Sequence, residues 1–409
     1  MRTRYGVSPW EAFQPRAQRP ERPRLHGDHE AAVVIIGGGL TGCAIAHACA
    51  AAGLKPLLVE AGRIGQGSSG RSAGLLLPEP GPSFRDAVER HGLRAARQVF
   101  ALWRQGARDA AAQLKRLGLA RGLETREHVT VAMPDSLTHL RREFDAQVAA
   151  GLDPTWLSPA QVRALAGVDA PGGMRTRGAS LLDPVQTTLG LARAGEAKGA
   201  VLLERSSVSR VRFDEKGVDL VVEGGAKGGR IRAGTVIVAT GSATAEFGPL
   251  KRHFKRRETY ATLSEPMPAA VRKSLGKPDV LLSTAAGVRR LTGQTRDGRL
   301  LVVGADQVET SARVREATVV QRTGQLMYET LLLFPSISGL QPEYGWEAGY
   351  GEAADGLMYV GAHRNYPHHL FALGGSSNSV TGSFVAAAVI ARAVRGQVEK
   401  GDDVLGWAR

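Results

Sequence analysis

The run Val33–Gly42, in which four branched apolar residues lead into a G-x-G-x-x-G spacing, constrains the fold more than any other stretch of this 409-residue chain. The apolar residues predict a strand buried on both faces, and the Ala-rich residues 41–52 predict a helix. Gly37, Gly39 and Gly42 would permit a tight turn, close approach of the backbone to a pyrophosphate, and close helix–strand packing. The helix N-terminus would then offer free N–H groups to the phosphates.

A carboxylate follows the next predicted strand. Residues 57–59 are apolar, and Glu60 comes directly after them. In a dinucleotide-binding βαβ unit, an acidic residue at about this distance binds the hydroxyls of the adenosine ribose. The order and spacing of strand, helix, second strand and acid therefore predict a dinucleotide site. By itself this pattern does not distinguish NAD from FAD. The alternative is a βαβ unit that binds no ligand.

The composition is that of a globular protein, with 43% hydrophobic and 22% charged residues. The 53 basic and 39 acidic side chains give a net charge of +14, but the basic residues are dispersed, so we expect no nucleic-acid partner. Cys43 and Cys49 are too few for a disulfide framework or a zinc site, and they suit a reducing cytoplasm. The longest apolar stretch, residues 384–391, is far shorter than the ~20 residues of a membrane span.

Hydrophobic periodicity predicts the remaining elements. We expect helices over residues 84–117, 137–150, 189–198 and 381–395, and a further helix that begins at Ser158-Pro159. We expect strands over residues 128–133, 200–203, 234–241 and 370–373, and a hairpin of residues 208–213 and 218–222.

Four short stretches beyond the dinucleotide motif carry a family resemblance. They are Gly65–Gly74, Ala239–Gly241, Asp355–Gly361 and Phe371–Gly374. Together with the motif they resemble the flavin-dependent glycine/D-amino-acid oxidase (DAO) family, and the match looks closest to amine oxidoreductases of the γ-glutamylputrescine oxidoreductase type. The resemblance covers nearly the whole chain and implies FAD rather than NAD.

The resemblance implies an α/β fold in two parts. One is a Rossmann-like FAD-binding domain, assembled discontinuously, and the other is an inserted α+β substrate domain with an antiparallel sheet. The expected parts are an N-terminal extension (1–28), three FAD-binding segments (29–85, 181–248 and 345–409) and two substrate-domain segments (86–180 and 249–344).

The resemblance also implies which residues contact the flavin. The loop 68–72 would run beneath the pyrophosphate and along the isoalloxazine ring, and Val208 would meet the adenine with its backbone. The helix beginning near Thr381 would direct its positive N-terminal end at the flavin. The expected FAD contacts are Gly37, Gly39, Leu40, Thr41, Gly42, Glu60, Arg63, Ser68, Ser69, Arg71, Ser72, Val208, Thr240, Gly241, Gly361, Gly374, Gly375, Asn378, Val380 and Thr381.

Three departures from the family pattern bear on function. Many members attach FAD through a loop His or a Cys in the C-terminal third, whereas this chain has Arg71 in the loop and no Cys beyond Cys49, so we expect noncovalent FAD. Members that oxidise amino acids hold the substrate carboxylate with an Arg where this chain has Tyr350, which favours an amine unless Arg290 substitutes. A turn that is usually Gly-Gly-Asn-Gly is Ser376–Ser379 here, and the added side chains would narrow the pocket.

The resemblance implies oxidation of the C–N bond of an amine. A hydride would pass from the carbon beside nitrogen to flavin N5, and the imine would hydrolyse. The candidates for facing the ring are Tyr260, Arg290, Tyr350, His363 and His369. Core packing is the alternative for Tyr260, and a structural role is the alternative for His363. We expect no metal site at His368-His369, because adjacent residues on a strand point to opposite faces.

Two other functions stay open: a catalytically degenerate FAD-binding partner or regulatory subunit, and an NAD-linked dehydrogenase. The electron acceptor, O2 or another, is open too. Relatives of the sarcosine-oxidase type carry a Lys where residues 300–304 are apolar here, which favours a dehydrogenase or slow reaction with oxygen. The oligomeric state is not predicted.

Overall fold

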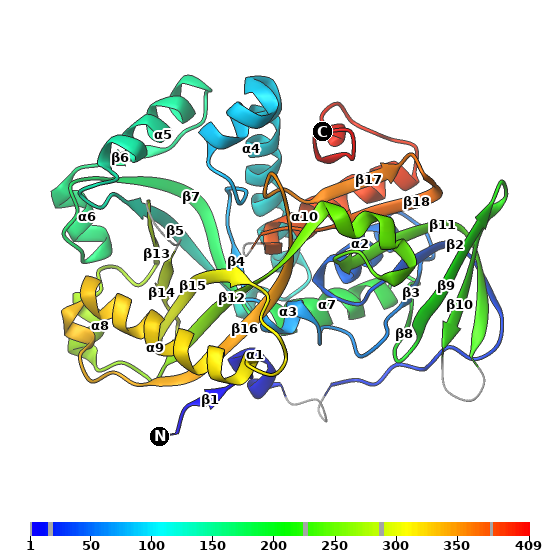
Figure 1. Cartoon of the computed structure of the whole chain (residues 1–409), viewed down its shortest axis with the longest axis horizontal. Coiled ribbons are helices and arrows are strands. Elements are labelled where there is room, and N and C mark those ends of the chain that lie inside the picture. Colours follow the sequence, from blue (N-terminus) through cyan, green and yellow to red (C-terminus); the bar gives the residue numbers. More distant parts are fainter. Residues whose placement is uncertain (1, 15–18, 224–227, 286–289, 377–378) are drawn as a thin grey trace.

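The computed structural model describes residues 2–14, 19–223, 228–285, 290–376 and 379–409. Its strands form two sheets, which lie at opposite ends of the long axis of the molecule (Figure 1). We refer to them as the nucleotide sheet and the ten-stranded sheet.

The nucleotide sheet is built around the predicted βαβ unit. Its strands, in spatial order, are β17 (Tyr359–His363), β18 (Tyr366–Leu373), β11 (Gly229–Gly241), β2 (His29–Ile36), β3 (Leu57–Val59) and β8 (Val201–Leu203). All neighbours from β18 to β8 run parallel, and the predicted hairpin, β9 (Ser207–Asp214) and β10 (Gly217–Glu223), joins the sheet along β11. Because both faces are covered, the last four residues of β2 are all buried, as their branched apolar sequence predicts.

The ten-stranded sheet is mostly antiparallel. Its strands, in spatial order, are β1 (Arg4–Tyr5), β16 (Pro342–Ala353), β12 (Phe254–Ser264), β15 (Leu300–Val308), β14 (Leu291–Gln294), β13 (Val280–Thr284), β5 (Leu123–Val131), β7 (Gly173–Leu182) and β4 (Leu75–Leu76), with β6 (Thr155–Leu157) beside β7. The pairs β1–β16 and β13–β5 are parallel, so the sheet is mixed rather than purely antiparallel.

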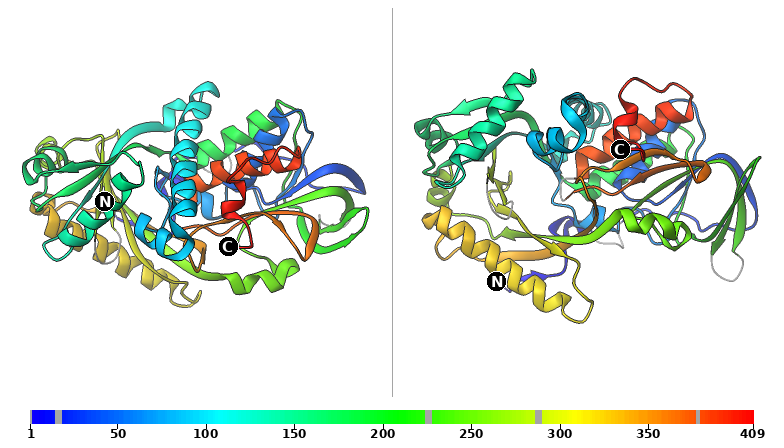
Figure 2. Two further views of the ribbon diagram at one scale, coloured as in Figure 1. Left: turned by 90° about the horizontal axis from the view of Figure 1, so that it is seen from above. Right: turned by 45° about the horizontal axis from the view of Figure 1, so that its top comes forward.

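Helices cover both sheets. They are α1 (Pro9–Phe13), α2 (Leu40–Ala51), α3 (Ser68–Arg71), α4 (Phe84–Arg116), α5 (Leu137–Ala149), α6 (Pro159–Ala166), α7 (Pro184–Glu196), α8 (Ala269–Ser274), α9 (Arg315–Leu333) and α10 (Ser379–Val394), and short 3-10 turns occur at Ala120–Gly122, Ala245–His253, Pro335–Ile337 and Asp402–Leu405. Helix α9 packs along β12, β15 and β16, and α4 stands between the two sheets in both views of Figure 2. No helix in the described ranges is both long enough and apolar enough to cross a membrane.

Local sequence signals set several helix ends. Helix α6 begins with a complete capping box between Ser158 and Gln161, and Pro159 fills its first position, as predicted. Helix α7 begins at Pro184, five residues before the predicted start. The buried carboxylate of Asp183 caps it by accepting from the N–H groups of Val185 and Gln186, both at 2.9 Å. Both cysteines are buried free thiols.

The chain passes between the sheets at residues other than the expected ones. Strand β4 lies in the ten-stranded sheet although it falls inside segment 29–85, and all of β16 lies there although segment 345–409 includes most of it. Helix α4, in segment 86–180, shares a core with α2 and α10 of the nucleotide sheet. Leu25 of the N-terminal extension is buried beneath the same sheet.

Candidate functional site

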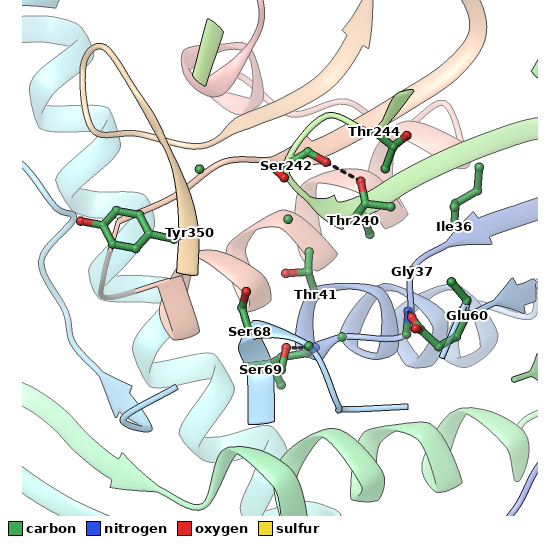
Figure 3. A pocket seen from close by; sticks show the side chains of 18 of the residues that line it. Ile36, Gly37, Thr41, Glu60, Ser68, Ser69, Thr240, Ser242, Thr244 and Tyr350 are labelled. Atoms are coloured by element: carbon green, nitrogen blue, oxygen red, sulfur yellow. Dashed lines mark hydrogen bonds between the residues drawn. The ribbon is translucent and has the colours of Figure 1, made fainter. Parts of the chain in front are cut away.

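A cavity of about 540 Å³ opens where β2, β3 and β11 end and α2 begins. In open parallel sheets this edge is where ligands bind, because the loops there leave a crevice beside the helix N-termini. Figure 3 shows Ile36 and Glu60 at one end of the cavity and Tyr350 at the other. The cavity is therefore elongated and reaches from the nucleotide sheet to the ten-stranded sheet.

Two glycines shape the turn between β2 and α2. A Cβ at Gly42 would lie 1.8 Å from the carbonyl oxygen of Gly37, so no side chain fits there. Gly37 has φ +110°, and a Cβ on it would lie 2.6 Å from the carbonyl oxygen of Ala239. Packing of backbone against backbone thus requires glycine at both positions, and it holds α2 with its N-terminus at the cavity.

The wall beside the start of α2 is formed by small hydroxyl residues in and next to the short helix α3. The hydroxyl of Ser69 accepts from the N–H of Leu40 at 2.8 Å, which joins the loop to the first turn of α2. The hydroxyl of Thr41 lies 2.9 Å from that of Ser383 on α10. Ser68 and Ser72 line the same wall. The loop and both helix starts therefore form one connected surface.

The carboxylate of Glu60 stands at the end of β3. Its Oε2 accepts from the N–H of Gly38 at 2.6 Å, and its Oε1 accepts from the N–H of Gly62 at 2.7 Å. These bonds fix the carboxylate at the cavity wall and leave lone pairs for hydroxyl groups of a ligand. This is the position that a ribose-binding acid requires.

At its other end the cavity is lined by Tyr350, which is hydrogen-bonded to an aspartate behind it. The phenol of Tyr350 donates to Oδ2 of Asp306 at 3.1 Å, while Arg257 lies 3.4 Å from Glu352. Burial, together with the charge of Asp306, raises the pKa of the Tyr350 phenol, so it stays a protonated donor. The second carboxylate oxygen of Asp306 is buried, and no hydrogen-bond partner for it is found among the described residues.

Comparison with known proteins agrees with this geometry. Residues 32–393 match the family of FAD dependent oxidoreductases called DAO. The chain belongs to this family. FAD is therefore the cofactor of this chain, and we call the cavity described above the FAD cavity.

Individual relatives are distant but cover nearly the full chain. Gamma-glutamylputrescine oxidoreductase of Escherichia coli is 24% identical over 90% of this chain and 85% of its own length. Among solved structures, glycine oxidase from Geobacillus kaustophilus superposes with a TM-score of 0.74 at 20% identity, covering 91% of this chain and 96% of that one. L-amino acid deaminase from Proteus myxofaciens superposes with a TM-score of 0.76 at 17% identity, covering 96% of each chain. These structures share the fold.

Most of the expected FAD contacts line the FAD cavity. They are Gly37, Gly39, Leu40, Thr41, Glu60, Arg63, Ser68, Ser69, Ser72, Val208, Thr240, Gly241, Gly374 and Val380. Gly42 packs behind the cavity, as described above. Gly361 on β17 and Gly375 after β18 are not among the lining residues. Asn378 lies outside the described residues.

Two expected contacts have protein partners instead. Arg71 forms an ion pair with Glu347 of β16, and its carbonyl oxygen accepts from Nε1 of Trp346 at 2.8 Å. The hydroxyl of Thr381 donates to the carbonyl of Leu77 at 2.6 Å. Both residues therefore fasten the loop and α10 in place from behind, rather than lining the cavity.

Of the five residues expected to face the ring, only Tyr350 lines the FAD cavity. Tyr260 is buried in the core beneath α9, where its hydroxyl donates to Glu258 at 2.6 Å. Arg290 forms an ion pair with Glu329 of α9. Tyr260 therefore packs in the core, which is the alternative given above for this residue. The guanidinium of Arg290 is already paired with a carboxylate.

The two histidines lie in an aromatic cluster on the nucleotide sheet. His363 contacts the rings of Tyr366 and Trp407, and His369 contacts the rings of Phe247 and Phe371. Burial lowers the pKa of both imidazoles, which keeps them neutral. Neither lines the FAD cavity. His369 is buried while its neighbour at position 368 is exposed, as expected for adjacent residues of a strand.

Sequence reasoning missed several residues of the site. Asp306, which accepts from Tyr350, is not itself a lining residue, whereas Arg256 of β12 lines the cavity. Ser242, Thr244 and Glu246 follow β11 and also line the cavity. The signal for these three was their place directly after a buried parallel strand, where cavity residues gather.

Proposed function

We propose that this chain oxidises the C–N bond of an amine with noncovalently bound FAD. The observation that carries the proposal is the elongated cavity, which joins a dinucleotide cradle at one end to the Tyr350–Asp306 pair at the other. Bound FAD would supply a two-electron acceptor for a hydride from the carbon beside nitrogen. The residues of the chain bind and orient the two reactants.

The nucleotide end fits FAD by its chemistry. The start of α2 and the serine loop offer N–H and hydroxyl donors where the pyrophosphate would lie, and Glu60 offers acceptors to the ribose. Neither route of covalent attachment is open, because Arg71 is bound to Glu347 and both cysteines are buried in α2. Burial raises the pKa of Cys49 to about 11, which keeps this thiol unreactive.

The substrate end favours an amine over an α-amino acid. A carboxylate clamp needs a guanidinium fork, and Tyr350 cannot provide one. The carboxylate of its partner Asp306 would repel a substrate carboxylate at this end. Tyr350 and Asp306 would thus orient the amine.

The purified protein tests this function in two steps. Acid precipitation should leave yellow FAD in the supernatant, and a yellow pellet would contradict noncovalent binding. Anaerobic addition of primary and secondary amines should then bleach the flavin absorbance, and simple amino acids should bleach it more slowly. The variant Asp306→Asn should retain FAD but bleach at least tenfold more slowly with amines, since it removes the charge (about 1.4 kcal/mol or more). If no amine bleaches a fully loaded protein, the chain is a binding partner rather than an oxidoreductase.

We also make proposals about the electron acceptor that reoxidises the flavin and about the cellular compartment of the protein. Because residues 300–304 on β15 are apolar, we propose that an acceptor other than O2 reoxidises the flavin. Comparison of reoxidation by air with reoxidation by artificial quinone acceptors tests this. We also propose a reducing compartment such as the cytoplasm, since Cys43 and Cys49 are free thiols.

A further inference from the structure

The densest basic run of the chain, residues 251–257, lies where the chain passes from the nucleotide sheet to the ten-stranded sheet. It comprises the end of the 3-10 turn that follows β11 and the start of β12. Five of its residues are lysine or arginine, a number that no other window of the same length reaches: Lys251, Arg252, Lys255, Arg256 and Arg257. The run is therefore a local concentration of charge in a chain whose other basic residues are dispersed.

Two of these charges are neutralised within the chain, and three are not. Arg256 and Arg257 are each paired with a glutamate, the second at 3.4 Å. Lys251, Arg252 and Lys255 are exposed, and no carboxylate of the described residues forms an ion pair with them. The segments outside the described residues contain no Asp or Glu. The three cations are thus available to a partner.

A fourth cation without an ion pair among the described residues lies beside the run. It is Arg364, exposed in the turn between β17 and β18. Burial lowers the pKa of the neighbouring His363, and the charges of Arg364 and Arg252 lower it further. Both cations therefore lie near the same imidazole ring. We call the four residues Lys251, Arg252, Lys255 and Arg364 the basic patch.

Half-buried aromatic rings connect the run to this turn. The indole of Trp407 stacks on the ring of Tyr359, with centroids 4.3 Å apart. It also contacts the rings of His253 and His363, with centroids 5.4 and 5.0 Å away. Aromatic side chains are enriched where proteins bind one another. The basic patch thus adjoins an aromatic group of the kind that a protein partner can cover.

The basic patch also adjoins the wall of the FAD cavity. Arg256 lines the cavity, and so does Gly351, its partner in the register between β12 and β16. A Cβ on Gly374, another lining residue, would lie 2.7 Å from the ring of Phe254 at the start of β12. The four residues of the basic patch are not among the described lining residues, so FAD binding does not account for them.

We propose that the basic patch docks an acidic electron-transfer protein, which reoxidises the reduced flavin. The assignment rests on the proposed function, in which the acceptor is not O2. Two molecules of a one-electron carrier would dock in turn and take one electron each, while the two protons of the reduced flavin pass to solvent. Because electron transfer slows steeply with distance, a docking surface beside the cavity wall suits this role.

The charge and the borders of the basic patch select this kind of partner. Complementary charge speeds the encounter of two proteins and fixes their orientation. Electron-transfer pairs bury little surface, less than about 1,200 Å² in total, so a few charges beside aromatic rings suffice. The carboxylates of Glu309 and Glu352 border the run through their ion pairs with Arg256 and Arg257. A long polyanion such as DNA would be repelled by these carboxylates, whereas a compact acidic face avoids them.

Calorimetric titration of the oxidised holoprotein with two cytochromes of opposite charge tests the assignment. At ~20 mM ionic strength, acidic cytochrome b5 should bind about tenfold more tightly than basic cytochrome c, and its affinity should fall about tenfold at ~200 mM. The double variant Lys251→Glu/Lys255→Glu should weaken binding of cytochrome b5 by about tenfold. Arg210→Glu/Arg212→Glu, the same change of charge on exposed residues of β9, should leave the dissociation constant within about threefold.

Electron transfer provides a second readout that needs no amine. Holoprotein that has been reduced photochemically should reduce the haem of cytochrome b5 about tenfold faster than the reduced double variant does. A small neutral quinone should be reduced at the same rate by both proteins, because it needs no charged docking surface. Equal rates of haem reduction by the two proteins would contradict docking at the basic patch.

Wild-type affinity for cytochrome b5 in the double variant would overturn the assignment, and so would equal affinities of the wild type for the two cytochromes. Because this second comparison needs no variant, it decides the matter even if the double variant does not fold. A duplex DNA oligonucleotide that binds more tightly than cytochrome b5, and only to the wild type, would also overturn it. Docking of cytochrome b5 without bleaching by any amine would refute amine oxidation but not the docking surface. Bleaching by amines without any preference between the cytochromes would do the opposite.

Discussion

The two ends of the FAD cavity are built in opposite ways. The cradle at the nucleotide end comes from short consecutive segments, and what it offers is backbone and small side chains, as at Gly37, Gly42 and Ser69. The other end brings β12, β15 and β16 together, and what it offers is larger polar side chains: Arg256 and Tyr350 line the cavity, and Asp306 accepts from Tyr350. The contrast indicates that the nucleotide end depends on the path of the chain, whereas the other end depends on side chains that tertiary contacts bring together.

Gly42→Val should cause the largest loss. Its Cβ would meet the Gly37 carbonyl oxygen at 1.8 Å, so the turn must open, at a cost of about 3 kcal/mol or more. We expect protein without FAD and a lower midpoint in urea. Gly324→Ala, on α9, has no neighbour within 4 Å and should stabilise the protein by up to ~1 kcal/mol. A yellow, stable Gly42→Val protein would refute a cradle made by close backbone packing.

Asp183, where the chain passes from β7 to α7, should produce a pH effect of about 3 kcal/mol. Burial raises the pKa of its carboxyl to about 6, above the ordinary value of 3.8. Because the folded protein holds this proton more tightly, the contribution is fully present below pH ~4 and is lost as pH rises through about 6. Asp183→Asn keeps an acceptor for the cap and removes this loss.

Urea unfolding of wild type and Asp183→Asn at several pH values measures this effect. The stability of the variant relative to the wild type should rise between pH ~4 and ~6 and stay constant above. Asp183→Ala, which also removes the cap, should be about 1 kcal/mol less stable than Asp183→Asn at every pH. If the difference in unfolding free energy between Asp183→Asn and the wild type did not change with pH, the raised pKa of Asp183 would be contradicted.

Trp346→Phe tests whether the ten-stranded sheet supports residues 68–72, which lie beside the FAD cavity. The indole is fully buried and donates to the carbonyl of Arg71, which loses its partner in the variant. We expect about 2 kcal/mol less stability and several-fold weaker FAD binding, measured by fluorescence titration of the apoprotein. Trp156→Phe, on β6 of the same sheet, should leave FAD affinity unchanged. Equal FAD affinity in both variants would show that residues 68–72 keep their conformation without the hydrogen bond from Trp346.

Tyr350→Phe should have the smallest effect and the most selective one. It removes one hydrogen bond to Asp306, worth about 1 kcal/mol, at the substrate end only. FAD content and unfolding should match the wild type, while the amine concentration for half-maximal bleaching should rise several-fold. Tyr328→Phe, on the exposed face of α9, is the matched control. A loss of FAD in Tyr350→Phe would place this residue at the cofactor instead.

The fold was predictable where the pattern is local. Periodicity and glycine spacing located β2, α2, β3, the hairpin and α6, since neighbours in sequence make these contacts. The boundaries between the two sheets were not predictable, because β4 and β16 join partners far along the chain. The same limit applies to catalytic candidates: residue type and position in the sequence favour Tyr260 and His369, but the structure packs both among aromatic or apolar side chains.

The sequence by itself determined the βαβ cradle, the acid at Glu60 and the family, because each depends on spacing along one short stretch. Only the tertiary structure decided that Arg71 pairs with Glu347, that Asp306 holds Tyr350, and that Glu79, His128 and Ser283 meet. Those contacts join residues that are between 44 positions (Asp306 and Tyr350) and 276 positions (Arg71 and Glu347) apart in the sequence. Residues so far apart produce no periodic pattern in the sequence, so whether they come into contact depends on how the two sheets pack.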